Sequence, residues 1–186
     1  MTTEPMPRDR ITIATMELIA DHGMADVTMS AIATQAGVAR QTLYNHFPDV
    51  ESIVVAAYAH HHAENIAQLQ RILATAPDPA AKLVQFIRHQ VAVAAHSHHG
   101  ALMDAGLSPS AQQRVHEQHA EMVELLYDIL VSGSVAGVFR SDLDAAATAT
   151  LVLHMVGGAT DLDEAGSEVA AIVAAAEALV LGGVRA

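Results

Sequence analysis

Apolar residues recur every three or four positions along most of the chain, and turn-forming residues divide this pattern into segments. The first segment, residues 8–22, places Ile11 and Ile19 on one helical face and ends before Gly23. A longer segment starts after Asp49, a residue suited to an N-cap, and stops at the prolines that follow residue 76. This spacing predicts amphipathic helices in both segments.

Similar start and stop signals bound the other expected helices. Thr28 is suited to an N-cap, Gly37 to a helix stop, and Pro79 and Pro109 to the first turn of a helix. The expected helices cover about residues 8–22, 29–36, 39–47, 49–76, 79–98, 101–105, 109 onward, 142–156 and 164–181. We predict a first domain at residues 1–48 and a second at residues 49–186.

The composition agrees with an all-α fold. Hydrophobic residues make up 52% of the 186 positions, but aromatic residues make up only 3% and Trp is absent. Ala, Val, Leu and Ile therefore build the core, as in closely packed helices, and the aromatic and β-branched runs typical of strands are missing. These features predict an all-α protein.

Several classes of protein are excluded by missing residues and motifs. The chain has no cysteine, so thiolate chemistry is absent and a reducing cytoplasm is the expected compartment. The apolar run at residues 169–184 is shorter than the roughly 20 residues of a membrane span, so no membrane association is expected. His116 and His119 have two residues between them instead of the three of a zinc peptidase motif. We expect no enzymatic activity and no cofactor.

The segment at residues 31–48, AIATQAGVARQTLYNHFP, has the pattern of a helix-turn-helix. Ala33 is a small residue four positions before Gly37, and Ile32 and Leu43 can lock the two helices together. The outward side chains of the second helix can hydrogen-bond to base edges or phosphates; they are Arg40, Gln41, Thr42, Tyr44 and His46. On spacing alone, a simple helical hairpin containing glycine remains an alternative.

Residues 8–60 resemble the N-terminal domain of the TetR family of transcriptional regulators. The similarity lies in a first helix ending in DHG and in the run VTMSAIATQAGVARQTLYNHFPDVESIV. A weaker match, GVFRSDLD at residues 137–144, resembles the segment before the family's dimerisation helices. The resemblance implies an N-terminal three-helix DNA-binding domain with a helix-turn-helix and a C-terminal helical effector-binding and dimerisation domain. It also implies a homodimeric repressor that binds double-stranded operator DNA and is released by a small effector.

The resemblance also implies roles for individual residues. Thr28, Tyr44 and His46 match phosphate-contacting positions of the family. The base-reading positions correspond to Arg40, Gln41 and Thr42. Family members often carry a Lys shortly after the HFP segment, where this chain has Asp49-Val50-Glu51, which implies one phosphate contact fewer.

The charge balance limits the DNA-binding surface. The formal net charge is −12, and residues 1–50 contain three arginines against six acidic residues. Arg8 and Arg10 are placed where they can reach the DNA backbone beside the major groove, while Arg40 lies in the second helix of the motif. Few phosphate contacts predict a weak salt dependence, because each neutralised phosphate adds roughly 0.9 to the slope.

Histidines are the main candidates for effector binding. There are 12 of them, and ten lie beyond residue 50. His119 shares a helical face with Val115 and Met122 and is expected to point inward. The candidate set is His61, His62, His89, His96 and His119. Neutral imidazoles suit Zn, Ni, Co or Cu, but they also serve as polar anchors of an organic effector, as core residues or as pH sensors. We favour an organic effector over a metal.

The last two expected helices are the candidates for dimerisation, because their small residues allow close approach of helix axes. The small residues are Ala146, Ala149, Gly157, Ala171 and Ala175, and the larger apolar ones are Leu151, Met155 and Leu179. The sequence leaves two alternatives to a DNA-binding repressor. One is a helical ligand-binding or scaffold protein that has lost DNA binding, and the other is a histidine-based metal sensor.

Overall fold

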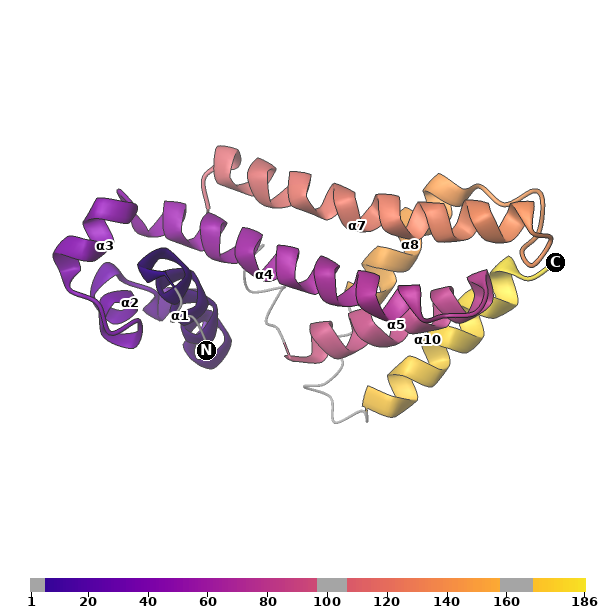
Figure 1. Ribbon diagram of the computed structural model, residues 1–186, viewed down its shortest axis with the longest axis horizontal. Coiled ribbons are helices and arrows are strands. Elements are labelled where there is room, and N and C mark those ends of the chain that lie inside the picture. Colours follow the sequence, from indigo (N-terminus) through magenta and orange to yellow (C-terminus); the bar gives the residue numbers. More distant parts are fainter. Residues whose placement is uncertain (1–5, 97–106, 158–168) are drawn as a thin grey trace. The chain divides into compact units, whose positions relative to one another are not determined.

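A computed structural model describes residues 6–96, 107–157 and 169–186 (Figure 1). The helices in these parts are α1 (Pro7–His22), η1 (Met24–Asp26), α2 (Met29–Gln35), α3 (Arg40–His46), α4 (Val50–Ala74), α5 (Pro79–His96), α7 (Pro109–Val135), α8 (Ala145–Gly157) and α10 (Val169–Val184). The all-α class is confirmed. The short helix expected at residues 101–105 and the expected start of the last helix lie outside the described residues.

Side-chain caps account for where several helices begin. Thr28 Oγ1 accepts a hydrogen bond from the backbone N–H of Ala31 at 3.1 Å, as expected for an N-cap. Asp49 Oδ1 accepts from the N–H of Ser52 at 2.7 Å, and Asp78 Oδ1 accepts from the N–H of Ala81 at 2.8 Å. An equivalent cap on Asp144 makes α8 begin at Ala145, three residues later than the sequence suggested.

The chain divides into two compact units. Unit 1 comprises Met1–Asn65 and Ala101–Gln118, and unit 2 comprises Ile66–Gly100 and His119–Ala186. Both α4 and α7 begin in unit 1 and end in unit 2. The boundary expected after residue 48 separates the part expected to contact DNA from the rest of the chain. The two units are defined by packing alone, so this boundary stays a prediction.

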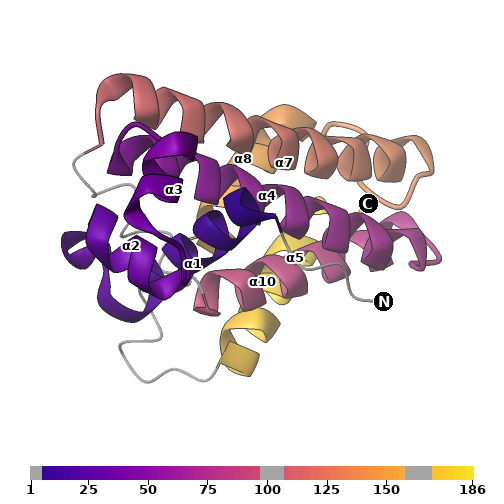
Figure 2. The same ribbon diagram turned by 60° about the vertical axis from the view of Figure 1, so that its left-hand side comes forward.

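In unit 1, α1, α2 and α3 pack against one another (Figure 2). Their shared core contains Ile11, Ile32 and Leu43, which are all fully buried. The first turns of α4 add Ile53 and Tyr58 to the same core. Burial of the Tyr58 ring raises the pKa of its hydroxyl well above the usual range, so this hydroxyl stays protonated. These contacts give the two short helices α2 and α3 a rigid support that helices of seven residues lack on their own.

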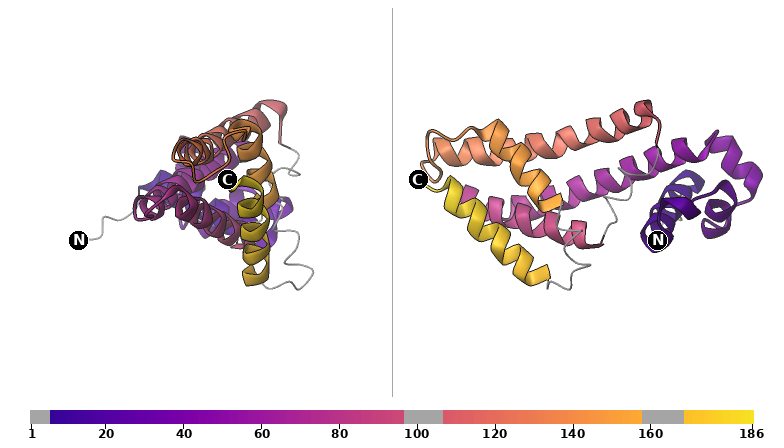
Figure 3. Two further views of the ribbon diagram at one scale, coloured as in Figure 1. Left: turned by 90° about the vertical axis from the view of Figure 1, so that its right-hand side faces the viewer. Right: turned by 180° about the vertical axis from the view of Figure 1, so that it is seen from behind.

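In unit 2, α5 packs against α8 and α10, and Figure 3 shows α10 lying alongside α5. The core is apolar and includes Phe86, Leu126 and Val152. At the edge of this contact Arg88 Nε donates to Glu177 Oε1 at 2.5 Å, which joins α5 to α10. This pairing raises the pKa of Arg88, mainly through the hydrogen bond to Glu177.

Candidate DNA-binding, effector and dimer surfaces

The turn between α2 and α3 has the geometry expected of a helix-turn-helix. Gly37 has a φ of 61°, in the left-handed region that favours glycine. The N–H of Val38 donates to the carbonyl of Ala33 at 3.0 Å, which closes α2. Ile32 and Leu43 are both fully buried and hold the two helices together. The helix-turn-helix prediction is therefore confirmed by the local structure.

Five of the six side chains expected to contact DNA lie on α3, and the sixth, Thr28, lies at the start of α2. Four of the five on α3 are exposed, namely Arg40, Gln41, Tyr44 and His46. Thr42 is half-buried, and Thr28 is exposed at the start of α2, where its hydroxyl already accepts the capping bond. Tyr44 is 49% exposed, although large hydrophobic side chains in this unit are mostly buried. The arrangement presents polar and aromatic groups to solvent from one short helix, which suits insertion into a major groove.

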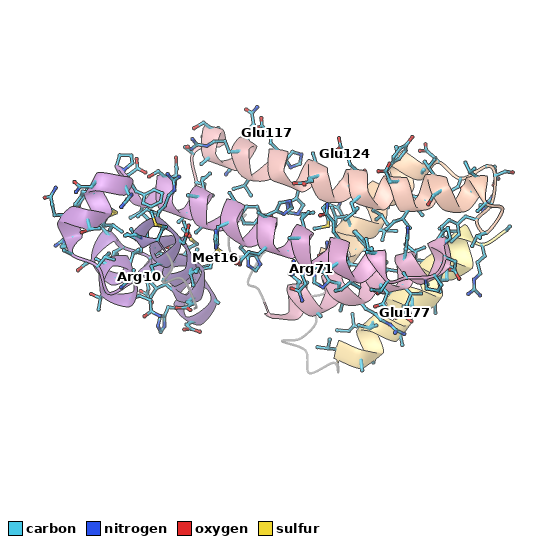
Figure 4. All side chains as sticks on the ribbon, in the orientation of Figure 1. Arg10, Met16, Arg71, Glu117, Glu124 and Glu177 are labelled. Carbon is cyan, nitrogen blue, oxygen red and sulfur yellow. The ribbon has the colours of Figure 1, made fainter. Side chains whose placement is uncertain are left out.

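The two arginines of α1 have other partners than the sequence suggested. One guanidinium nitrogen of Arg10 donates to the carbonyls of Ala36 at 2.7 Å and Gly37 at 3.0 Å. Figure 4 labels Arg10 in unit 1. The guanidinium carbon of Arg8 lies 5.1 Å from the ring centroid of Phe47. Both arginines therefore contact the protein itself within unit 1.

Glu51 has a structural role that the sequence did not reveal. Its carboxylate accepts hydrogen bonds from the backbone N–H of Ser108 at 2.8 Å and from the hydroxyl of Ser108 at 2.7 Å. These bonds, the backbone one first, lower the pKa of Glu51. Because Ser108 directly precedes α7, Glu51 ties the first turn of α4 to the first turn of α7 within unit 1.

Two candidate effector histidines lie on the part of α4 that belongs to unit 1. His62 is buried and its ring stacks on Tyr58, with centroids 6.2 Å apart. His61 is half-buried, and burial lowers its pKa, so its ring is neutral at neutral pH. Neighbouring His60 places Nε2 3.5 Å from Glu64 Oε1, which is a long ion-pair distance.

The other candidate histidines belong to unit 2. His89 is buried on α5, and His119 is half-buried on α7. Val115 and Met122, which were expected on the same helical face as His119, are buried. His96 is the last residue of α5, and the position of its side chain lies outside the described parts. The inward orientation expected for His119 is therefore only partial.

Gln90 is a buried polar residue that no motif or spacing in the sequence marks. It lies beside His89 on α5, and its amide nitrogen contacts the sulfur of Met122 on α7. A thioether is a weak hydrogen-bond acceptor, so this contact is a modest partner for a buried amide. Gln90 therefore joins His89 as a buried polar residue of unit 2. Among the residues that the structure describes, no three His, Asp or Glu side chains converge to hold a metal.

The exposed faces of α8 and α10 carry no charged residue. Their exposed positions are Ala146, Ala147, Thr150, Leu151, His154 and Gly157 on α8, and Ala170, Ala171, Ala174, Ala175, Ala178, Leu179, Gly182 and Gly183 on α10. Leu151 is 71% exposed and Leu179 is 68% exposed, which is unusual for leucine. The structure corrects one expected member of this surface, because Ala149 is fully buried inside unit 2, and Met155 is half-buried.

These elements together define an all-α DNA-binding protein with a helix-turn-helix and a separate helical unit. The comparisons with known proteins give the family. Residues 11–57 match the family described as bacterial regulatory proteins of the tetR family, and residues 76–161 match the tetracyclin repressor-like C-terminal domain. The chain belongs to the TetR family of transcriptional regulators.

Relatives of known function are similar over most of the chain. The HTH-type transcriptional repressor KstR2 of Mycolicibacterium smegmatis is 29% identical over 142 residues, which is 74% of this chain and 69% of that protein. The fatty acid metabolism regulator protein of Bacillus subtilis is 26% identical over 152 residues, covering 80% and 76% of the two chains. A solved structure of the transcriptional regulator FadR from Bacillus subtilis in complex with stearoyl-CoA has a TM-score of 0.82 at 22% identity, covering 94% of this chain and 97% of that one.

Membership in this family establishes the general activity. The protein is a ligand-responsive DNA-binding transcriptional regulator that acts on operator DNA as a homodimer. The family consists of regulators, which confirms that the protein is not an enzyme. In the parts of the chain that the structure describes, no helix is both long and apolar enough to cross a membrane.

Proposed function

We propose that the protein is a cytoplasmic repressor whose DNA-binding domain, residues 1–48, reads its operator through α3. The observation that carries this proposal is the row of exposed polar side chains on α3, the helix that follows the turn at Gly37. Arg40, Gln41 and Thr42 contact bases, while Thr28, Tyr44 and His46 contact phosphates. Binding of an effector in the remaining part, residues 49–186, changes the spacing of the two recognition helices of the dimer and releases the operator.

Substitutions on α3 test the reading of DNA. Duplexes retained by the purified protein from a random-sequence pool supply the operator. Arg40→Ala is expected to relax the preference at one or two base pairs by about 1–3 kcal/mol, because a bidentate arginine contact discriminates by that amount. His46→Ala is expected to weaken binding about equally for all sequences, because a phosphate contact carries no sequence information. Titration by fluorescence anisotropy against matched and mismatched duplexes separates the two effects.

The matched control is His22→Ala, which removes an exposed histidine from the end of α1 instead of α3. Binding by this variant is expected to equal that of the parent. If Arg40→Ala and His46→Ala both bind the selected operator as tightly as the parent, α3 does not read DNA in the proposed way.

We propose a long-chain acyl thioester of coenzyme A as the effector class. The support comes from the relatives, one named for fatty acid metabolism and one solved with stearoyl-CoA, and from unit 2, whose apolar interior contains the buried polar residues His89 and Gln90. Effector sites are mostly apolar and carry a few polar groups that fix orientation. In unit 2 the candidate polar anchors are His89, His96 and His119, with Gln90 added to them. His61 and His62, on the part of α4 in unit 1, stay candidates within that unit.

Calorimetry with stearoyl-CoA tests this effector class. Binding to the parent is expected, and His119→Ala should weaken it about tenfold, because a lost buried hydrogen bond costs roughly 1–3 kcal/mol. His116→Ala is the matched control, since His116 is exposed one turn earlier on α7. Parallel titrations with Zn, Ni, Co and Cu test the alternative. Stoichiometric metal binding that disappears in His119→Ala, without binding of stearoyl-CoA, would establish a metal sensor in its place.

A further inference from the structure

The two arginines of α1 contact the chain at opposite ends of the recognition helix. Arg10 bonds to the carbonyls of Ala36 and Gly37, which lie before α3 begins at Arg40. Arg8 lies over the ring of Phe47, the residue that follows the end of α3. Both contacts lie within unit 1, and both join α1 to residues 26 or more positions away along the chain.

The Arg10 contact fixes the turn that sets the start of α3. Carbonyl groups at the end of a helix carry partial negative charge and lack partners within the helix, so a guanidinium is a favourable donor to them. Gly37 takes a φ of 61° there, and a Cβ atom at this position would lie 3.1 Å from the Arg10 nitrogen. The glycine therefore supplies the left-handed turn and leaves room for the arginine that holds it.

The Arg8 contact fixes the other end of the helix. Phe47 is 3% exposed, and its backbone N–H donates to the carbonyl of Leu43 at 2.9 Å, so the ring position is coupled to the last turn of α3. A guanidinium over an aromatic face is attracted by the ring electrons and covers the ring from water. Arg8 thus holds Phe47 in the place where α3 ends and the chain turns toward α4.

We infer that Arg8 and Arg10 are positioning residues for DNA recognition, which fix the orientation of α3 instead of contacting phosphates. Residues 1–50 contain only one further basic residue, Arg40. Arg40 is exposed on α3, so it is the arginine of residues 1–50 that we expect to contact DNA. The two arginines of α1 therefore contribute to operator specificity and not to the charge-driven part of binding, which accounts for most nonspecific affinity.

The salt dependence of binding distinguishes positioning from phosphate contact. Arg10→Met removes the charge and the donors but keeps a long side chain. For this variant we expect an unchanged slope of log K against log salt and at least a tenfold fall in the ratio of specific to nonspecific affinity. Loss of a side chain that neutralises a phosphate would instead lower the slope by roughly 0.9. Binding is measured with the operator isolated from a random-sequence pool and with a scrambled duplex of equal length.

Circular dichroism at the temperature of the binding assay shows whether each variant is folded. If Arg10→Met does not fold, Arg8→Met, which loses only one contact with a ring face, gives the same test and the same expected pattern. A slope that falls by roughly 0.9 with an unchanged affinity ratio would show a phosphate contact and overturn the inference. A folded variant with the slope and the ratio of the parent would overturn it as well, because the arginines would then only stabilise the fold.

Discussion

Replacing Leu151 or Leu179 by arginine is expected to convert the dimer to monomers or to aggregates. In the single chain, Leu151 is 71% exposed and Leu179 is 68% exposed. They lie on faces of α8 and α10 that are otherwise formed mainly by alanine and glycine. Contact between two such faces buries a large apolar area, and each Å² of it stabilises the dimer by roughly 25 cal/mol. A guanidinium buried in this contact without a partner destabilises the dimer strongly. Sedimentation velocity at micromolar concentration measures the change.

Val135→Arg provides the control for this prediction. Val135 is 85% exposed at the end of α7, outside the two proposed dimer helices, so an arginine there is expected to leave the dimer intact. A parent protein that sediments as a monomer would contradict dimerisation through α8 and α10. Dimers that persist in both leucine variants would show that the contact lies on another surface.

Operator binding should be lost together with the dimer. Two recognition helices joined in one molecule bind neighbouring half-sites with a high effective concentration, and this matters most for a protein with few phosphate contacts. Residues 1–50 have a net negative charge, so a single copy attracts DNA only weakly. Dimerisation through the apolar faces of α8 and α10 is therefore expected to compensate for the few phosphate contacts that each copy of this acidic protein can make.

The sequence predicted those features that depend on neighbouring residues. Helix starts at Thr28 and Asp49 were predictable because an N-cap bonds to a residue three positions later. The turn at Gly37 was predictable because only glycine adopts its φ without strain. The outward face of α3 then followed from the position of buried Leu43.

Contacts between distant parts of the chain were not predictable in the same way. Arg10 was expected near the DNA backbone, but its partners Ala36 and Gly37 lie 26 and 27 positions away and their carbonyls leave no sequence signal. The bonds between Glu51 and Ser108 span 57 positions. Ala149 was assigned to the dimer surface because alanine fits both a close helix contact and a core, and only the packing of unit 2 decides between them.

Phe139→Ala is expected to lower the free energy of unfolding by about 3–5 kcal/mol, the usual cost of removing a buried phenyl ring. Phe139 is 1% exposed in the loop between α7 and α8, and its N–H donates to the carbonyl of Gly133 at 3.1 Å. The next residue, Arg140, donates its N–H to the carbonyl of Val184 at the end of α10. The ring thus anchors a loop that joins three helices of unit 2. Urea unfolding at one fixed protein concentration measures the loss, with Val138→Ala as the half-buried control in the same loop.

Gly133→Ala tests the same contact from the opposite side. A Cβ atom at Gly133 would lie 2.0 Å from Cδ2 of Phe139, so the ring must move, and overpacking of this kind costs about 1–3 kcal/mol although alanine favours a helix. Combining Gly133→Ala with Phe139→Leu should recover part of that loss, because the smaller side chain vacates the space that the new methyl group occupies. If the two substitutions destabilise additively, or if Gly133→Ala alone stabilises the protein, Phe139 does not pack against α7 at this glycine.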